Sequence, residues 1–393
     1  APPAAPRAAA DPARFAANAD ELLARAGGVP VRVASKSVRV RSLVARAGER
    51  GFQGVMAYSV REALWLVESG VRDVLVGYPS VDRGALAALA RHEAGRREVT
   101  LMVDDAAHLE LVRHALAETG TGDEPPVRVC LDVDASLRVG LGLVTVHLGT
   151  RRSPLHGARD VASLAARVVS TPGLALRGLM FYEAQVAGMP DSSLAVRAVK
   201  RLSVLELGER RGEVVAAVRD VVGHGLELVN SGGTGSLETS SADAVVTEVT
   251  AGSGLYVPGL FDEYRAFRPR PSAFFGLDVV RVPGPGWATA FGGGYVASGP
   301  ATRSRLPRVV TPGWSLTGRE GAGEVQTPLH RSRGAAGAPD LGVGDRVWFR
   351  HGKAGEAMER SDRVHLVRGD EVVDVVPASR GDGRSCGLGD TSP

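Results

Sequence analysis

Short β-branched runs alternate with longer amphipathic stretches from about residue 30 to residue 265. Helical spacing of the apolar positions is clear at 42–50, 60–69 and 85–94. The β-branched runs predict eight strands, at 31–36, 54–58, 73–77, 99–103, 127–133, 174–181, 226–230 and 244–250. Eight strand-helix alternations favour a closed parallel β/α barrel of the TIM type over an open sheet.

The pattern changes near residue 270, where helical periodicity is mostly lost and glycine and proline separate short strands. These strands are predicted at 274–282, 287–290, 346–349, 363–368 and 371–376. The chain is therefore predicted to be an α/β protein in two domains. A barrel covers 28–268, and an antiparallel C-terminal β domain covers 269–393, with residues 1–27 added to it as an N-terminal extension. The glycine-rich tail, 380–393, is expected to be flexible.

Composition narrows the classes of protein that fit. The 393 residues are 44% hydrophobic, enough for a sizeable core, and the formal net charge is only +3. No cluster of basic residues is interleaved with aromatics, so a nucleic-acid partner is not expected. No segment reaches the roughly 20 apolar residues of a membrane helix, and Ala1–Ala10 lacks the features of a signal peptide. The sequence thus predicts a cytoplasmic protein with no membrane partner.

Two cysteines give no disulfide framework and no CxxC pair. Cys130 lies in an apolar run and is expected to be a buried thiol. Cys386 lies in the tail and is expected to be exposed.

Lysine is scarce in this arginine-rich chain, and Lys36 ends the first predicted strand. Active sites of β/α barrels lie at the C-terminal ends of the strands. A lysine in that place can form a Schiff base with an aldehyde cofactor. Taken alone, an ordinary solvated lysine at a strand end explains Lys36 better.

Two glycine-rich loops change that balance. Asn-Ser-Gly-Gly-Thr-Gly-Ser at 230–236 follows the seventh predicted strand, and Ala-Gly-Ser-Gly-Leu-Tyr at 251–256 follows the eighth. Glycine lets backbone N–H groups approach a phosphate closely. The loops after strands seven and eight are the usual phosphate site of such barrels. Together with Lys36, they indicate pyridoxal 5'-phosphate (PLP).

These features resemble the fold-type III PLP enzymes, which have an alanine racemase-like barrel. The resemblance rests on the lysine-bearing strand, Tyr182-Glu183 after the sixth strand, and the two glycine loops. In the C-terminal domain, 343–347 and 362–377 resemble D-threonine aldolase and eukaryotic-type D-serine dehydratase. The similarity extends over roughly residues 28 to 380. It implies an amino-acid substrate and a homodimer.

The resemblance also implies roles for individual residues. Lys36 should hold PLP and shuttle a proton, and Tyr182 should line the pocket. Arg138 falls where the family places an arginine near the pyridine ring, although a structural salt bridge is an equal alternative. Tyr256 either closes the phosphate end of the site or simply packs. The residues expected to hold the phosphate are Ser231, Gly233, Thr234, Ser253 and Gly254.

The chain departs from the family pattern at two places. The lysine motif of the family has flanking histidines, where this chain has Ala34 and Val38. The relatives bind a divalent metal through a His-x-Asp or His-x-Cys pair, where this chain has His351-Gly352-Lys353. A lysine ammonium has no lone pair to give a metal.

The second departure predicts that no divalent metal is bound. In that hypothesis Lys353 takes the place of the cation, and His351 and Glu356 position it. The alternative is a misalignment that leaves Lys353 at the surface. If a metal is bound, His351 is its expected ligand.

The resemblance implies a lyase for β-hydroxy-α-amino acids, with the D form expected, that cleaves them to glycine and an aldehyde. A dehydratase that yields a keto acid and ammonia is the alternative. In both reactions Lys353 or His351 is the expected proton partner of the β-hydroxyl. A racemase with Tyr264 or Tyr295 as its second base is a further alternative, as is a non-catalytic PLP carrier.

Two histidines, His147 and His156, flank Arg151-Arg152 in the segment after the fifth strand. They either touch a substrate carboxylate or occupy solvated loop positions, and the second interpretation is favoured.

Overall fold

The computed structural model describes residues 7–141, 144–191, 193–265, 268, 270–300, 302–335, 337–353 and 355–385. Residues 1–6 and the end of the predicted tail, 386–393 with Cys386, lie outside the described residues. The described chain forms two compact units. One contains 7–20, 36–50 and 252–385, and the other contains 21–35 and 51–251. The domain limits predicted from the sequence stay a prediction.

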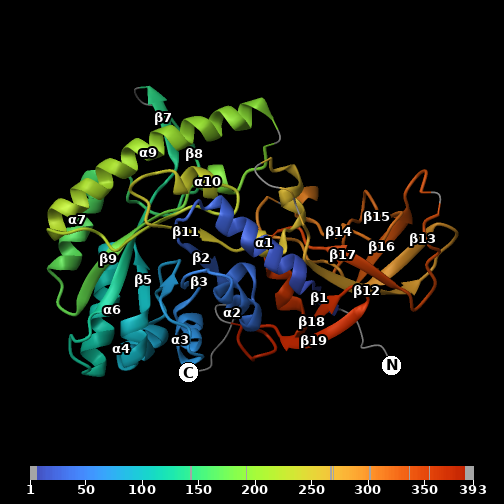
Figure 1. Cartoon of the computed structure of the whole chain (residues 1–393), viewed down its shortest axis with the longest axis horizontal. Coiled ribbons are helices and arrows are strands. Elements are labelled where there is room, and N and C mark those ends of the chain that lie inside the picture. Colours follow the sequence, from blue (N-terminus) through green and yellow to red (C-terminus); the bar gives the residue numbers. More distant parts are fainter. Residues whose placement is uncertain are drawn as a thin grey trace. The chain divides into compact units, whose positions relative to one another are not determined.

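The second unit is built around a closed barrel of eight strands, all paired in parallel (Figure 1). This confirms the predicted fold class and strand count. The barrel closes where Val249 pairs with Val31. The strands are β2 (Val31–Ala34), β3 (Val55–Ala57), β4 (Val74–Val76), β5 (Val99–Val103), β6 (Val127–Val133), β9 (Leu174–Phe181), β10 (Leu228–Ser231) and β11 (Glu248–Ala251).

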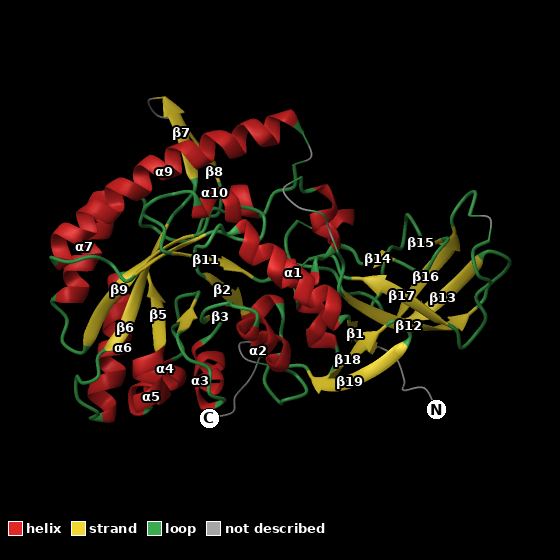
Figure 2. Cartoon of the chain, in the orientation of Figure 1, coloured by secondary structure: helices red, strands yellow, loops and turns green. Residues whose placement is uncertain are grey.

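Amphipathic helices of the same unit follow the barrel strands (Figure 2). Side-chain caps fix where some of them begin: Ser59 accepts the N–H of Glu62 at the start of α3, and Asp105 accepts that of Ala107 at the start of α6. The helices are α3 (Val60–Glu68), α4 (Arg83–Arg91), α5 (Glu93–Glu98), α6 (Ala106–Thr119), α7 (Ala158–Val169), α8 (Ala184–Ala187), α9 (Leu194–Val222) and α10 (Leu237–Ser241).

The prediction of a single helix at 85–94 was wrong, because the helix is interrupted there and the segment forms two helices, α4 and α5. His92 has extended backbone angles, and its ring nitrogen Nδ1 accepts the N–H of Gly95 at 2.7 Å. The ring thus caps a new helix. Apolar spacing alone does not show such a cap.

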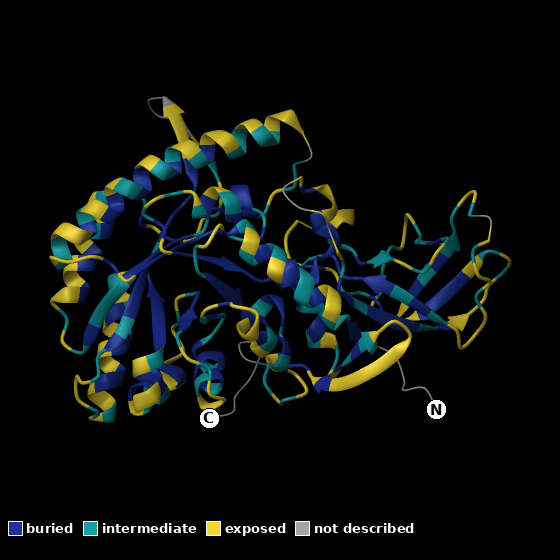
Figure 3. Cartoon of the chain, viewed as in Figure 1, coloured by how far each residue is buried: buried dark blue, intermediate teal, exposed yellow. Residues whose placement is uncertain are grey.

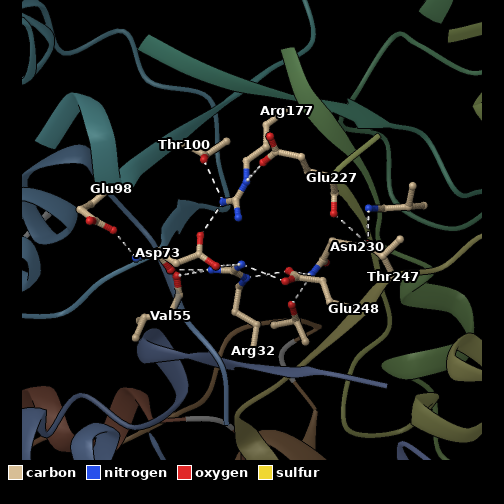
Figure 4. Close-up of polar contacts among 12 residues, drawn as sticks. Arg32, Val55, Asp73, Glu98, Thr100, Arg177, Glu227, Asn230, Thr247 and Glu248 are labelled. Atoms are coloured by element: carbon tan, nitrogen blue, oxygen red, sulfur yellow. Dashed lines mark hydrogen bonds and ion pairs between the residues drawn. The ribbon is translucent and has the colours of Figure 1, made fainter. Parts of the chain in front are cut away.

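One end of the barrel interior is ionic (Figure 4). Arg32 is fully buried and donates to Glu248 at 2.6 and 2.8 Å and to Asp73 at 2.8 Å. Burial lowers the pKa of Arg32, but the two carboxylates outweigh it and raise the value. Burial opposes ionisation of Asp73, yet Arg177 and Arg32 hold its pKa down at about 2.

The next layer toward the C-terminal ends of the strands is apolar. Side chains two residues apart on a strand face the same side, so Met102 follows Thr100 of the ionic layer on β5. The apolar layer consists of Leu75, Met102, Cys130, Met180 and Leu228. Cys130 is buried there, as predicted, and burial raises the pKa of its thiol.

The first unit contains a sheet whose pairings are antiparallel except for that of β1 with β18. Its order is β15-β16-β13-β12-β1-β18-β19, and β17 pairs with β12 and β14. The strands are β1 (Arg7–Ala10), β12 (Ala273–Arg281), β13 (Trp287–Phe291), β14 (Arg308–Val309), β15 (Trp314–Leu316), β16 (Gln326–Arg331), β17 (Arg346–Arg350), β18 (Arg363–Arg368) and β19 (Glu371–Pro377).

The core of this sheet is aromatic and aliphatic, with Phe275 stacked on Phe349 at 5.2 Å between ring centroids. The edge strand β19 is largely exposed (Figure 3). The largely antiparallel C-terminal β sheet that the sequence predicted is thus confirmed. The same unit holds α2 (Arg41–Glu49) and α11 (Ser253–Tyr256), whereas α1 (Pro12–Arg25) runs across the division of the chain.

A hairpin of β7 (Leu137–Leu141) and β8 (Val144–Leu148) follows barrel strand β6. The sequence analysis did not predict it, and it carries Arg138 and His147.

Among the described helices, none has both the length and the apolar character to cross a membrane.

Candidate active site

Lys36 lies just after barrel strand β2. The strand predicted to reach Lys36 ends at Ala34, and Ser35–Ser37 form a 3-10 turn that leaves the lysine half-buried. The turn meets the second glycine loop, since the hydroxyl oxygens of Ser37 and Ser253 are 3.3 Å apart. The structure therefore brings the lysine segment and the predicted phosphate loop after β11 together.

Tyr256 joins the same two segments. Its hydroxyl donates to the carbonyl of Val38 at 2.9 Å, and its ring lies edge-on to Phe15 and His351. Complete burial raises the pKa of the phenol. Of the two predicted roles, these contacts support packing.

The first glycine loop is organised by Glu183, a buried residue just after strand β9. Its carboxylate accepts hydrogen bonds from the hydroxyls of Ser236 at 2.7 Å and Ser240 at 2.5 Å. The Ser231 hydroxyl, at 3.0 Å, and the Gly232 N–H, at 3.2 Å, reach its other oxygen. Ser231, predicted to bind phosphate, is therefore already engaged by protein groups. Glu183 entered the sequence analysis only as part of the resemblance, because nothing local shows four donors converging on it.

Gly233 comes too close to its neighbours for any side chain. A Cβ there would lie 2.9 Å from the Cβ of Ala187 and 3.6 Å from the ring of Tyr182. The Thr234 carbonyl accepts from the Arg25 guanidinium at 2.7 Å. The loop is a fixed turn, since the Gly233 N–H donates to the Ser236 hydroxyl at 3.1 Å. A fixed glycine loop against an aromatic ring fits a phosphate-bearing cofactor.

Acidic residues line the barrel mouth above the apolar layer. Asp132 on β6 faces the interior two residues after Cys130. Burial and the charge of Asp104 raise the pKa of Asp132 to about 7, although Arg152 opposes the shift. The Arg152 guanidinium lies 5.5 Å from the centroid of the Tyr182 ring. Burial raises the pKa of Tyr182 to about 12, so its phenol stays protonated at neutral pH.

Arg138 forms an ion pair with buried Asp134 at 2.6 Å. The salt bridge allowed for in the sequence analysis is therefore present, and the pyridine contact stays a prediction. The same arginine lines a pocket of about 520 Å³. The pocket is lined by Arg138, His147, Arg151, Arg152, Ser153 and Pro154.

The two C-terminal candidates lie in different surroundings. His351 is buried, and burial together with Arg350 lowers its pKa to about 3. Lys353 is half-buried, with its Nζ 3.4 Å from the Ser298 hydroxyl. The turn that carries Lys353 packs on the lysine segment, since a Cβ on Gly355 would lie 3.0 Å from the Lys36 carbonyl oxygen.

The prediction that no divalent metal is bound stays a prediction. Within the described ranges, no group of three or more His, Cys, Asp or Glu side chains could hold a metal ion. Lys353 stands where a second ligand was expected, and the buried His351 Nε2 has no hydrogen-bond partner.

Comparison with solved structures places the fold. The chain shares its fold with the fold-type III PLP enzymes. It matches D-threonine aldolase from Filomicrobium marinum with a TM-score of 0.79 and 21% identity, covering 98% of this chain and 96% of the other. It matches D-threo-3-hydroxyaspartate dehydratase from Delftia sp. HT23 with a TM-score of 0.73 and 19% identity, covering 96% and 98%. Alanine racemase from Corynebacterium glutamicum gives a TM-score of 0.58 at 15% identity, covering 88% and 89%.

Two proteins related in sequence to this chain are aldolases. The chain is 27% identical over 251 residues to a D-threonine aldolase of Arthrobacter sp., and 27% identical over 220 residues to a 3-hydroxy-D-aspartate aldolase of Paracoccus denitrificans (strain Pd 1222). The matches span 63% and 56% of this chain, but only 60% and 50% of those relatives' own lengths. No family model matches the chain. The chain is thus homologous to aldolases of this fold type, as the sequence analysis predicted.

Proposed function

We propose that this protein is a PLP-dependent lyase that cleaves β-hydroxy-α-amino acids of the D form to glycine and an aldehyde. The observation that carries the proposal is the meeting of the Lys36 segment with the glycine loop after β11. The names of both sequence relatives favour the aldolase over the dehydratase. The proposal places the protein in the cytoplasm.

The residues present fit the cofactor. The Lys36 Nζ would hold the aldehyde carbon of PLP. Backbone groups of Gly233 and Gly254, with the hydroxyls of Thr234 and Ser253, would hold the phosphate. When bound, PLP supplies the electron sink that stabilises a carbanion at the substrate Cα.

The β-hydroxyl needs a partner that stabilises developing negative charge on its oxygen. Lys353 suits this role because its ammonium is a point charge on a flexible stem, and because its turn packs on the Lys36 backbone. His351 suits it less, since a ring with a pKa of about 3 is neutral near pH 7 and has no positive charge to stabilise that oxygen. The proposal therefore assigns the role to Lys353, without a metal.

The dehydratase stays the second candidate, because the fold is also that of a D-threo-3-hydroxyaspartate dehydratase. The racemase alternative is less favoured. Tyr264 packs in an apolar cluster with Val257, Leu260 and Phe261, and Tyr295 packs on Phe275.

The test is an assay of PLP-loaded protein with D- and L-threonine, D-serine and D-phenylserine, with and without a chelator. The expected products are glycine and an aldehyde, in amounts the chelator does not change. Lys353→Gln should lose most activity, whereas Lys200→Gln, which breaks an ion pair with Asp191, should keep it. A keto acid with ammonia would make the protein a dehydratase. Loss on chelation with recovery on adding divalent metal would contradict the role of Lys353.

A further inference from the structure

Arg305, at the end of a short 3-10 turn in the first unit, has a guanidinium with unsatisfied donors. The turn spans Arg303–Arg305, and the Arg305 side chain is half-buried. Its Nε and Nη1 atoms are both buried and have no hydrogen-bond partner among the described residues. Of the arginines in the described ranges, no other has two such nitrogens. Buried donors of a charged group are costly to leave unpaired, so their presence points to a ligand that pairs with them.

The neighbouring backbone leaves room for this guanidinium. Gly299 has a φ of +119°, which favours glycine, and a Cβ there would lie 2.7 Å from the Arg305 Nε and 3.2 Å from its Nη2. A side chain at position 299 would therefore displace the charged group. The Arg305 carbonyl also accepts the Ala297 N–H at 2.9 Å. Backbone and side chain of Arg305 are thus both held against the segment 297–299.

The same segment contacts Lys353. The Lys353 Nζ lies 3.4 Å from the Ser298 hydroxyl. Gly352, the residue before Lys353, packs on the Arg305 turn, since a Cβ on Gly352 would lie 2.7 Å from the Arg305 carbonyl oxygen. Ser298 and Gly299, which are adjacent in sequence, therefore each contact one of two cations, Lys353 and Arg305.

The lysine segment belongs to the same unit. A Cβ on Gly355 would lie 2.6 Å from the Ser37 carbonyl oxygen and 3.0 Å from that of Lys36. Lys36, Lys353 and Arg305 are thus connected by direct packing within one unit. In a β-hydroxy-α-amino acid, the carboxylate and the β-oxygen are attached to neighbouring carbons, so two cations on adjacent residues match these two groups.

We infer that Arg305 binds the α-carboxylate of the substrate, while Lys353 faces the β-oxygen. The inference rests on the proposed function for the substrate class and adds the group that recognises the acid. A guanidinium presents two N–H groups side by side, which suits a carboxylate better than a single ammonium does. The α-carboxylate is not altered when the Cα–Cβ bond breaks. Its contact with Arg305 therefore contributes to binding in the ground state as well as in the transition state.

The binding test avoids turnover by using D-2-aminobutyrate and its amide, D-2-aminobutyramide. Both lack the β-hydroxyl, and only the acid has a carboxylate. In calorimetry on the PLP-loaded protein, the wild type should bind the acid about 10- to 100-fold more tightly than the amide. Arg305→Met, which keeps an unbranched stem and removes every donor, should bind both alike, and Arg305→Lys should retain part of the preference. Arg303→Met removes an exposed arginine of the same turn and is the matched control, which should bind as the wild type does.

Thermal melting without substrate separates a binding role from a structural one. Because two of its donors are unpaired, Arg305→Met should melt at no lower temperature than the wild type, and a large loss of stability would overturn the inference. A preference for the acid that is absent from the wild type, survives in Arg305→Met or is lost equally in Arg303→Met would also overturn it, even if D-threonine is cleaved. A preference that only the Arg305 variants lose, without cleavage of any substrate, would keep the carboxylate site and reject the lyase.

Discussion

Glu183 shows how one buried side chain can shape a binding loop at a distance along the sequence. It accepts hydrogen bonds from three serine hydroxyls and one backbone N–H of the segment 231–240. A carboxylate with so many donors is strongly held, and hydrogen bonds to charged groups contribute about 1.5–3 kcal/mol each. The shape of the proposed phosphate loop therefore depends on a residue that does not touch the phosphate.

Glu183→Gln should loosen this loop, because an amide has only one acceptor oxygen and presents two N–H donors to the surrounding hydroxyls. We expect the Kd for PLP to rise by about tenfold or more. Titration of the cofactor-free protein with PLP, followed by absorbance, measures it. Glu213→Gln, on the exposed side of helix α9, is the control. An unchanged Kd in Glu183→Gln would show that the loop does not depend on this carboxylate.

Asp132 makes stability depend on pH. Its folded pKa of about 7 lies above the ordinary aspartate value of 3.8, so the folded protein holds this proton more tightly than the unfolded chain. Between these two values stability falls as pH rises, and the loss persists above pH 7.

Asp132→Asn removes this penalty. The variant should melt at a higher temperature than the wild type at about pH 8, and its advantage should shrink toward about pH 4. Melting curves across this range, with the exposed Asp220→Asn as control, measure the effect. A constant difference at all pH values would mean that Asp132 does not titrate as described.

At the scale of elements, the barrel strands could be predicted from the sequence, whereas the inserted hairpin could not. Strands such as Val99–Val103 are short apolar runs between helices, which is the pattern of buried parallel strands. The hairpin of β7 and β8 lies between a strand and the helix that normally follows it. Its alternating residues were a signal, but the expected strand-helix order left no place for it.

Strand β1 could not be predicted for a different reason. Arg7–Ala10 is mostly alanine, which has little preference for strands. Its partners, β12 and β18, lie more than 260 residues away in sequence. The same limit applied to the site: Lys36 and the glycine loops are local motifs, whereas the contacts of Glu183 and Arg152 arise only when distant segments meet.

Gly178 tests the packing of barrel strands. A Cβ at this position of β9 would lie 1.8 Å from the Leu228 carbonyl oxygen on β10. Gly178→Ala must push these strands apart, so we expect a loss of at least about 1–3 kcal/mol in the free energy of unfolding. Urea unfolding followed by circular dichroism measures it.

Gly212→Ala is the matched control, because no atom lies within 4 Å of a Cβ there. In the interior of helix α9 it should stabilise the protein by about 0.5–1 kcal/mol. If Gly178→Ala were as stable as the wild type, the pairing of β9 with β10 in this register would be wrong.

At the scale of the whole molecule, the two ends of the barrel in the second unit have different roles. One end stabilises the fold, and the other holds residues of the proposed active site. The ionic layer of Arg32, Asp73 and Glu248 lies toward the N-terminal ends of the strands. Asp132, the loop after β10 and the pocket lined by Arg151 and Arg152 lie at the C-terminal ends of the strands. Barrel enzymes have their active sites at this end. Changes at Arg32 should therefore affect folding rather than chemistry.

The assembly state stays a prediction. The resemblance implies a homodimer, and sedimentation equilibrium of the PLP-loaded protein should give twice the mass of the chain. A monomer that still cleaves its substrate would show that the resemblance does not extend to assembly.

The central claim is that Lys36 carries the cofactor. The chain has only three lysines, Lys36, Lys200 and Lys353, so borohydride reduction of the PLP-loaded protein followed by peptide mass spectrometry can assign the linkage. We predict that the cofactor is found on the peptide that contains Lys36, and that Lys36→Ala abolishes the adduct while Lys200→Gln retains it. Recovery of the adduct on Lys200 or Lys353, or no adduct in the wild type, would contradict the account.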